Sequence, residues 1–201
     1  MHNKIIKYVS IFIFLLVLAP LFLFIIIIIY FDSGRPLFHY RESVGLNEST
    51  IFVIKFRTMK KDADEILNRW EKENKKYYTQ YSKHNKLKKD PRVTKIGKYL
   101  RKYSLDELPQ LINVLKGEMN LVGPRPITEQ EAKIIDVKTM KIRTSVRPGM
   151  TGLWQVNGRQ ETSFQERIKL DVEYVNNRSI WNDFIIIIKT IPSVLFSKGA
   201  Y

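Results

Sequence analysis

The feature that most restricts the fold of this chain is an almost unbroken apolar run near its N-terminus, from Val9 to Phe31. Ser10 and Pro20 are its only real interruptions. As a helix the run extends roughly 34 Å, about the thickness of the hydrocarbon core of a bilayer. A cleaved signal peptide fits poorly, because the run is long for such a segment and no small-residue cleavage site follows it. We therefore expect residues 1–34 to form a membrane anchor.

Two courses through the membrane are open to this anchor. A plain span would place the larger group of basic residues, which follows the run, on the cytoplasmic side. Alternatively, Pro20 removes a backbone hydrogen bond in the middle of the helix and bends it, so that the segment enters and leaves by the same face. Both courses leave residues 35–201 in the cytoplasm. Both alternatives stay open at this point, a plain span or a re-entrant helix–break–helix at Pro20, because proline-kinked spanning helices are common.

The remaining residues predict a small mixed α/β (α+β) domain. Alternating residues predict a β-hairpin within Pro36–Met59, with strands at Leu37–Tyr40 and Thr50–Arg57. Apolar periodicity and caps predict several amphipathic helices, over residues 62–81, 93–100 and 108–115 and from Ser163 onward, where Glu166 completes a capping-box pattern. The apolar residues 181–196 either lie in the membrane interface or form a buried core helix.

Composition narrows the chemistry. The chain has no cysteine, which excludes disulfides, thiolate nucleophiles and cysteine-ligated zinc. Its three histidines show no spacing typical of metal ligands, and we assign them no role. A formal net charge of +14 should attract polyanions, whether nucleic acid, an anionic membrane surface or phosphorylated substrates.

The densest group of reactive side chains surrounds the adjacent carboxylates Asp106 and Glu107. One interpretation is purely structural, because Ser104 and Glu107 have the spacing of a capping box at the start of a helix. The alternative is a phosphoryl-transfer site, in which one carboxylate attacks phosphorus and the other holds Mg²⁺. Arg101 and Arg125 lie close by in the sequence, and the arginine fork suits diphosphate oxygens.

Two further clusters carry cations. The segment from Arg147 through Pro148 and Gly149 to Arg159 is rich in glycine and could cradle the nucleotide end of a substrate, although an ordinary glycine-rich loop has the same composition. It contains no P-loop pattern. Lys55 and Arg57 lie on one face of the second predicted strand, close to the membrane anchor.

Several strings of this sequence, in their order along the chain, resemble the bacterial sugar transferase family of monotopic phosphoglycosyl transferases. They are KFRTM, SLDELPQLINVLKGEM, LVGPRP, RPGMTGLWQVNGR and LDVEYVNNRS. The resemblance runs from about Pro20 to Tyr201. It implies a cytoplasmic catalytic domain at the inner membrane of a bacterium, held by one re-entrant helix that bends at Pro20.

The resemblance also implies a reaction. Asp106 would attack the sugar-bearing phosphate of a UDP-sugar and release UMP, and the phosphosugar–aspartate intermediate would pass to undecaprenyl phosphate. Glu107, beside Asp106, would ligate Mg²⁺. Arg101 and Arg125 would bind phosphate groups, and Arg147 with the following loop would help to hold the nucleotide. This would be the first membrane step of a surface-glycan pathway, such as capsule or O-antigen synthesis, and it leaves a homodimer open.

Two departures from the family matter. Many relatives have serine before the helix-breaking proline, where this chain has Ala19. Longer relatives carry a multi-span membrane region ahead of the catalytic unit, which is not in this sequence. The ending Lys198–Tyr201 resembles that of the branch of the family that handles galactose- or glucose-1-phosphate.

Three other functions each fit part of the sequence. A membrane-tethered nucleic-acid-binding protein would use the positive charge and the tyrosines at 77, 78 and 81, but it leaves the two carboxylates unexplained, and we expect no nucleic-acid partner. A non-catalytic scaffold would not need the catalytic-looking residues, all of which are present. A hydrolase would pass the covalent intermediate to water, and a requirement for lipid would distinguish it.

Overall fold

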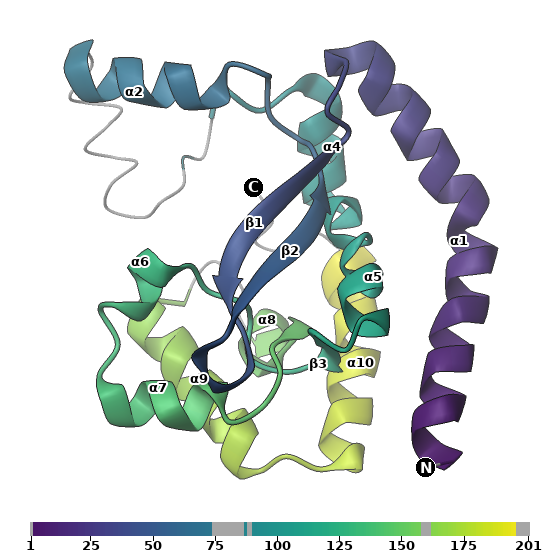
Figure 1. Ribbon diagram of the computed structural model, residues 1–201, viewed down its shortest axis with the longest axis vertical. Helices are drawn as coiled ribbons and strands as arrows, with labels where there is room; N and C mark the ends of the chain where they lie inside the picture. Colours follow the sequence, from purple (N-terminus) through teal and green to yellow (C-terminus); the bar gives the residue numbers. More distant parts are fainter. Residues whose placement is uncertain (1, 74–86, 88–89, 158–161, 196–201) are drawn as a thin grey trace.

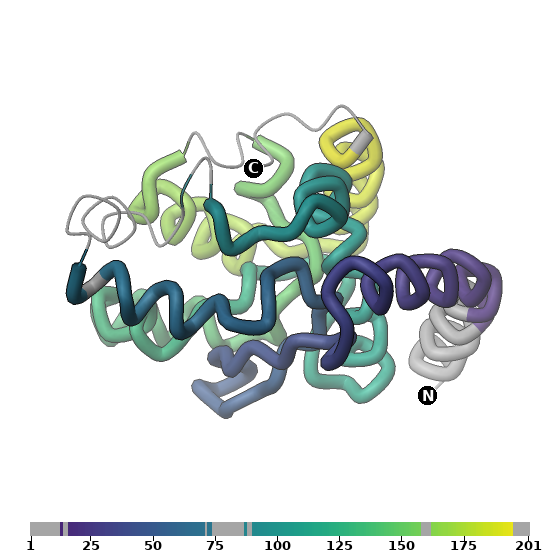
Figure 2. The backbone as a smooth tube through the Cα atoms, turned by 90° about the horizontal axis from the view of Figure 1, so that it is seen from above, coloured from purple at the N-terminus to yellow at the C-terminus, as the bar shows by residue number. Residues whose placement is uncertain are grey.

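The structure is a computed structural model that describes residues 2–73, 87, 90–157 and 162–195. It has the mixed α/β composition expected from the sequence, with helices arranged around a two-stranded antiparallel sheet and a separate parallel strand pair (Figure 1). A long N-terminal helix runs beside this body along one edge, as the view from above shows (Figure 2). Residues 77, 78 and 81, the tyrosines considered for nucleic-acid binding, lie outside the described residues.

Helix α1 (His2–Ser33) contains the apolar run and is continuous through Pro20. Its axis changes direction about half-way along (Figure 1), as a proline inside a helix causes by removing one backbone hydrogen bond. The segment Leu16–Ser33 is long and apolar enough to cross a membrane. Only Ile25 and Ile29 are buried among its described side chains, where they pack with Phe56 and Leu100. Whether α1 spans a membrane or re-enters it stays a prediction.

The predicted hairpin is confirmed. Strands β1 (Phe38–Val44) and β2 (Thr50–Phe56) pair antiparallel from Phe38 opposite Phe56 to Val44 opposite Thr50, and the 3₁₀ turn η1 (Leu46–Glu48) joins them. One face of β2 packs on a helix, since Ile51 and Val53 share a buried cluster with Leu111, Val114 and Met119. The hairpin therefore joins the end of the anchor to the centre of the domain.

Helices α2 (Ala63–Glu73) and α4 (Lys95–Lys102) follow the hairpin, close to where amphipathic periodicity placed them. Residues 74–81 of the first predicted helix lie outside the described residues. Thr94 caps α4 by accepting a hydrogen bond from the Gly97 amide, which is how a threonine N-cap satisfies one free N–H of the first turn.

The predicted start of the amphipathic helix, at residue 108, is wrong. The chain instead forms a short 3₁₀ turn, η2 (Leu105–Glu107), and then the six-residue helix α5 (Gln110–Leu115) with Pro109 at its N-cap. Proline has no amide hydrogen to donate and fixes its own φ, so it favours a new helix start at this point. Gly117 follows the end of α5, with a positive φ of 76° that glycine adopts without strain.

A pair of very short parallel strands, β3 (Asn120–Val122) and β4 (Gly149–Thr151), was not predicted. Three residues are too few to show a period in the sequence. Helices α6 (Glu129–Ala132) and α7 (Val137–Thr144) fill the connection between the two strands, and α8 (Leu153–Asn157) follows β4.

Helices α9 (Phe164–Asn176) and α10 (Ile180–Leu195) complete the described chain. Ser163 caps α9 by accepting from the Glu166 amide, as the sequence predicted. Helix α10 buries Ile186 against Val122 and Tyr174 but exposes most of its large apolar side chains: Ile180, Trp181, Phe184, Ile188 and Ile191. The buried-core alternative for this segment is therefore wrong, because the helix lies on the surface.

Candidate active site

The two carboxylates singled out from the sequence lie in the η2 turn, between α4 and α5. Ser104, just before the turn, has a positive φ of 54°, and its side chain makes no capping hydrogen bond. The capping-box interpretation of Ser104 and Glu107 is therefore wrong. Asp106 is buried, with 8% of its surface exposed, although it belongs to a charged class of side chain that is rarely buried without a partner.

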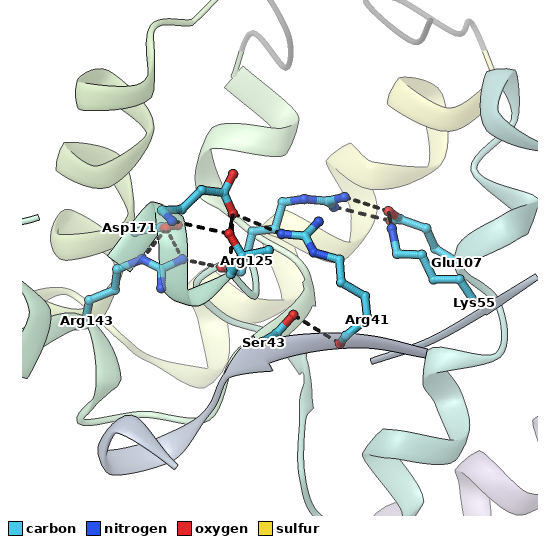
Figure 3. Close-up of polar contacts among 9 residues, drawn as sticks. Arg41, Ser43, Lys55, Glu107, Arg125, Arg143 and Asp171 are labelled. Carbon is cyan, nitrogen blue, oxygen red and sulfur yellow. Dashed lines mark hydrogen bonds and ion pairs between the residues drawn. The ribbon is translucent and has the colours of Figure 1, made fainter. Parts of the chain in front are cut away.

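Glu107 is held by two cations from different parts of the chain. Its Oε1 accepts hydrogen bonds from Lys55 Nζ on β2 and from Arg125 Nη2, both at 2.7 Å, and Arg125 Nη1 lies 3.4 Å from Oε2 (Figure 3). Burial alone would raise the pKa of Glu107, but the charges of Arg125 and Lys55 overcome it and hold that pKa well below its usual range. Glu107 is thus ionised and neutralised by its neighbours.

Asp106, the adjacent residue, differs from Glu107. In the part of the chain that the structure describes, no side chain or backbone amide donates a hydrogen bond to its carboxylate. Burial raises the pKa of Asp106 to about 6, the charge of Lys55 opposes this, and the neighbouring charge of Glu107 adds to it. At neutral pH this carboxylate is ionised and more basic than an ordinary aspartate, which are the properties of an oxygen nucleophile.

Arg101 supplies a further positive charge near Asp106. Its Nε donates to Thr58 Oγ1 at 2.9 Å, which ties α4 to the segment after β2. Burial lowers the pKa of Arg101, and the charge of Asp106 partly offsets that effect. Since arginine remains charged in proteins in any case, Asp106 faces a permanent cation without being bound to it.

A small, open hollow lies beside this group, lined by Arg41, Ser43, Val53, Lys55, Gln110, Arg125 and Pro126. Lys55 and Arg125 line the hollow and also bind Glu107, so an anion entering it meets cations that are already in place. Arg41 was not singled out from the sequence. It comes from β1 and pairs with Glu131 at 3.0 Å, where Glu131 forms part of the capping box of α6.

Of the residues predicted for the site, the structure brings together Lys55, Arg101, Asp106, Glu107 and Arg125. It places Arg57 elsewhere, although Arg57 is only two residues beyond Lys55. The Arg57 Nη2 donates to Ser33 Oγ at 2.9 Å and to the Gly34 carbonyl at 2.6 Å, at the C-terminal end of α1. Arg57 therefore caps the anchor helix, whose last carbonyls need donors and favour a positive charge.

The described part of the glycine-rich cluster, residues 147–157, packs against the loop that carries Arg125, since the Trp154 ring centroid lies 6.0 Å from the Arg125 guanidinium and the Gly149 amide donates to the Pro124 carbonyl at 2.8 Å. Residues 158 and 159 of the cluster lie outside the described residues. Gly149 is buried in β4, and a Cβ at this position would fall 2.1 Å from the Gly123 amide nitrogen. The close approach that needs glycine is thus between two protein backbones. Pro148 is buried and its carbonyl accepts from the Asn120 amide, while Arg147 is exposed. This cluster fixes the loop that carries Arg125, and a direct role in binding a nucleotide stays a prediction for these three residues.

Sequence reasoning missed several side chains that support the site. Asn113, fully buried on α5, accepts from the Ile54 amide at 3.0 Å and donates to the Phe52 carbonyl at 2.8 Å, which fixes α5 to β2. Arg143 on α7 and Asp171 on α9 form a buried ion pair behind Arg125. The burial of Asp171 could have been inferred from the sequence, because Asp171 follows Ile168 by three residues and therefore lies on the apolar face predicted for its helix.

The two carboxylates are the residues of this site that could hold Mg²⁺. Among the described residues there is no cluster of three or more histidine or acidic side chains that could hold a metal ion alone. Two adjacent carboxylates are nevertheless what Mg²⁺ takes from proteins when substrate phosphates and water supply its other ligands. Asp106 and Glu107 would hold the ion, and when bound it would supply positive charge to the phosphate oxygens.

Comparison with known proteins identifies the family. The sequence profile described as bacterial sugar transferase matches residues 1–197. This chain belongs to that family. It is therefore a transferase, and the resemblance seen in the sequence motifs is confirmed.

Named relatives of this sugar transferase include an exopolysaccharide production protein and two undecaprenyl-phosphate sugar phosphotransferases. The exopolysaccharide production protein ExoY of Rhizobium meliloti is 43% identical over 187 residues, which cover 93% of this chain and 82% of that protein. An undecaprenyl-phosphate galactose phosphotransferase of Salmonella typhimurium is 40% identical over 191 residues, covering 93% of this chain but 39% of that protein. An undecaprenyl-phosphate glucose phosphotransferase of Komagataeibacter xylinus is 36% identical over 197 residues, which cover 93% of this chain and 34% of that protein.

Proposed function

We propose that this sugar transferase moves a hexose-1-phosphate from a UDP-sugar to undecaprenyl phosphate, through a covalent intermediate on Asp106. The observation that carries the proposal is the difference between the two adjacent carboxylates. Glu107 is neutralised by Lys55 and Arg125, whereas Asp106 is buried and ionised without a hydrogen-bond donor among the described residues. A buried, ionised carboxylate whose oxygens accept no hydrogen bond can form a bond to phosphorus.

The proposed reaction has two steps that balance. An oxygen of Asp106 forms a bond to the phosphorus that carries the sugar, and the bond from that phosphorus to the oxygen of UMP breaks. An oxygen of undecaprenyl phosphate then attacks the same phosphorus and the bond to Asp106 breaks. The products are UMP and a sugar joined to the lipid by a diphosphate, and the enzyme regains its carboxylate.

The cations of the site have a clear part in this chemistry. Phosphoryl transfer concentrates charge on the oxygens around phosphorus, and fixed positive groups stabilise that charge. Lys55, Arg101 and Arg125 come from three different elements and are held in place by Glu107 and Thr58. We propose that they bind the diphosphate of the donor, with Mg²⁺ held by Asp106 and Glu107 as the cofactor. The named galactose and glucose transferases among the relatives make a hexose donor the first to test.

We also propose that the enzyme works at the cytoplasmic face of a bacterial inner membrane. Helix α1 exposes most of its described apolar side chains, and α10 exposes Trp181, Phe184 and Ile188. Exposed apolar rows of this size lie in lipid more favourably than in water. The positive charge of the chain suits a surface of anionic lipid, at about 1 kcal/mol for each basic residue near it.

The decisive experiment measures UMP release by purified protein in detergent with Mg²⁺, undecaprenyl phosphate and a panel of UDP-sugars. We expect release with UDP-galactose or UDP-glucose that depends on both the lipid and the metal. Release that continues in the presence of a chelator would rule out the role of Mg²⁺. Release of more than one UMP per chain without the lipid would indicate transfer to water instead. Folded protein that releases no UMP with any donor would overturn the proposed function.

A further inference from the structure

Behind the active site, Arg143 and Asp171 form an ion pair that is almost completely hidden from solvent. Arg143 comes from α7 and Asp171 from α9, and their residues are 3% and 2% exposed. Arg143 Nε donates to Asp171 Oδ2 at 2.9 Å, and Nη2 lies at the same distance from the same oxygen. No atom of this pair takes part in the proposed chemistry.

The same arginine reaches the loop that carries Arg125. Arg143 Nη2 donates a short hydrogen bond to the main-chain carbonyl of Arg125, so that one guanidinium joins Asp171 to the loop (Figure 3). Arg125 stands between Pro124 and Pro126, whose rings restrict the backbone on both sides. The direction in which the Arg125 side chain leaves this loop is therefore fixed by its own prolines and by Arg143.

A role in stability alone explains the pair poorly. Burying two charges carries a large desolvation penalty, and well-packed apolar residues of similar size are often as stable or more so. Burial raises the pKa of Asp171 to about 6 even though Arg143 opposes the effect, which indicates that desolvation exceeds the attraction between the two charges. A pair that contributes little net stability but binds a loop of the site points to a function in that loop.

We propose that Arg143 and Asp171 are positioning residues for Arg125. Asp171 orients the Arg143 guanidinium, Arg143 fixes the Arg125 carbonyl, and the Arg125 side chain is thereby kept on Glu107 at 2.7 Å. The inference rests on the proposed function, in which Arg125 serves phosphate transfer. It extends that function to two helices, α7 and α9, that contribute no group to the chemistry.

The test replaces both charges by apolar side chains of similar size, in the variant Arg143→Met/Asp171→Leu. This change removes the contact with the Arg125 carbonyl and leaves no unpaired buried charge behind. We expect kcat for UMP release to fall about 10- to 100-fold, as is typical when the residues that orient a functional group are lost. The KM for the UDP-sugar should change much less. Asp171→Asn, which keeps the volume and an acceptor oxygen, provides a second variant if the double replacement does not fold.

A matched control weakens the same helix without touching Arg125. Asp136 caps α7 by accepting from the Thr139 amide at 2.9 Å, and Asp136→Ala should lower the melting temperature by removing that cap. Its kcat should remain within about twofold of wild type, since distant changes act independently. The melting temperature of each variant then shows whether a loss of kcat merely follows a loss of stability.

The last experiment introduces the double replacement Arg143→Met/Asp171→Leu into protein that also carries Arg125→Ala. If the pair acts through Arg125, it should cause no further loss of kcat there, because contacting residues of one network are not additive. An equal loss in both backgrounds would overturn the inference, as would a folded double variant with wild-type kcat. If wild-type protein releases no UMP, the proposed function itself fails. If wild type and the double variant are equally active, only the inference about Arg143 and Asp171 fails.

Discussion

Asp106 and Asp171 are both buried aspartates whose pKa burial raises to about 6, yet their surroundings differ in one respect. Asp171 is bound directly by Arg143, and that arginine also binds the loop of Arg125. Asp106 has three cations nearby, Lys55, Arg101 and Arg125, but in the described chain none of them makes an ion pair with it. Glu107 takes two of those cations instead.

The difference shows how adjacent carboxylates in one turn can be given separate tasks. A bound carboxylate is held still, and it orients whatever binds it. An unbound carboxylate in the same field of charge is ionised, but its oxygens are not occupied by a donor. The comparison predicts that changing Asp106 removes the reaction, whereas changing Asp171 weakens it and alters stability.

The largest effect should come from Asp106→Asn. The amide cannot form the bond to phosphorus, and loss of a nucleophile typically lowers turnover by about 10,000-fold or more. UMP release by this variant and by wild type is compared at equal amounts of folded protein. Asp171→Asn serves as the matched control, because it makes the same chemical change at the other buried aspartate. Turnover of Asp106→Asn near the wild-type rate would contradict the assignment of Asp106.

The next largest effect should come from Arg125→Lys. Lysine keeps the charge but not the fork that meets both Glu107 oxygens, and loss of one fixed donor at a charged transition state costs about 100- to 1,000-fold in kcat. Steady-state UMP release measures it. Lys138→Ala, at an exposed lysine on α7, should leave kcat unchanged. If Arg125→Lys were as active as wild type, charge alone would suffice at this position.

The pH dependence of stability sharpens the comparison at Asp171, which faces Arg143 and the loop of Arg125. Its folded pKa of about 6 lies above that of an unfolded aspartate, so this group favours folding at low pH and its contribution is lost as the pH rises through about 6. The loss amounts to about 3 kcal/mol over the whole range. Melting temperatures of wild type and Asp171→Asn from pH 5 to 8 should therefore shift in favour of the variant. A constant difference between the two proteins would contradict the raised pKa.

The smallest effect on activity should come from Arg57→Ala. The substitution leaves the carbonyls at the end of α1 without their donor, and it should cost about 1–3 kcal/mol of stability. UMP release by the remaining folded protein should stay within a few-fold of wild type. Lys55→Ala, two residues earlier on the same strand, should instead lower kcat strongly. A large loss of kcat in Arg57→Ala at unchanged stability would instead indicate that Arg57 binds the substrate.

Much of the fold followed from local patterns. The apolar run, the alternating hairpin and the cap at Ser163 depend on neighbouring residues, and the structure contains each of them. The start of α5 was predicted wrongly because apolar periodicity through Leu108 outweighed the effect of Pro109. The strands β3 and β4 are held by the close approach of Gly123 and Gly149, a contact between distant segments that no local pattern records.

The candidate site could be predicted in part. Asp106, Glu107, Arg101 and Arg125 lie in two motifs rich in charge and proline, and the structure brings them together with Lys55. Arg57 and Gly149 have equally suitable chemistry in the sequence, but three-dimensional packing places them in structural contacts. The roles of Asn113, Arg143 and Asp171 depend on which buried polar groups meet across helices, and that information appears only in the folded chain.

The most direct test looks for the proposed covalent intermediate. Wild-type protein is incubated with Mg²⁺ and the UDP-sugar that supports UMP release, without undecaprenyl phosphate, and the intact protein and its peptides are weighed by mass spectrometry. We predict an added hexose phosphate on the peptide that contains Asp106, one UMP released per modified chain, and loss of the adduct when the lipid is added. An enzyme that turns over with lipid but never carries the adduct, or carries it on another residue, would contradict the role assigned to Asp106.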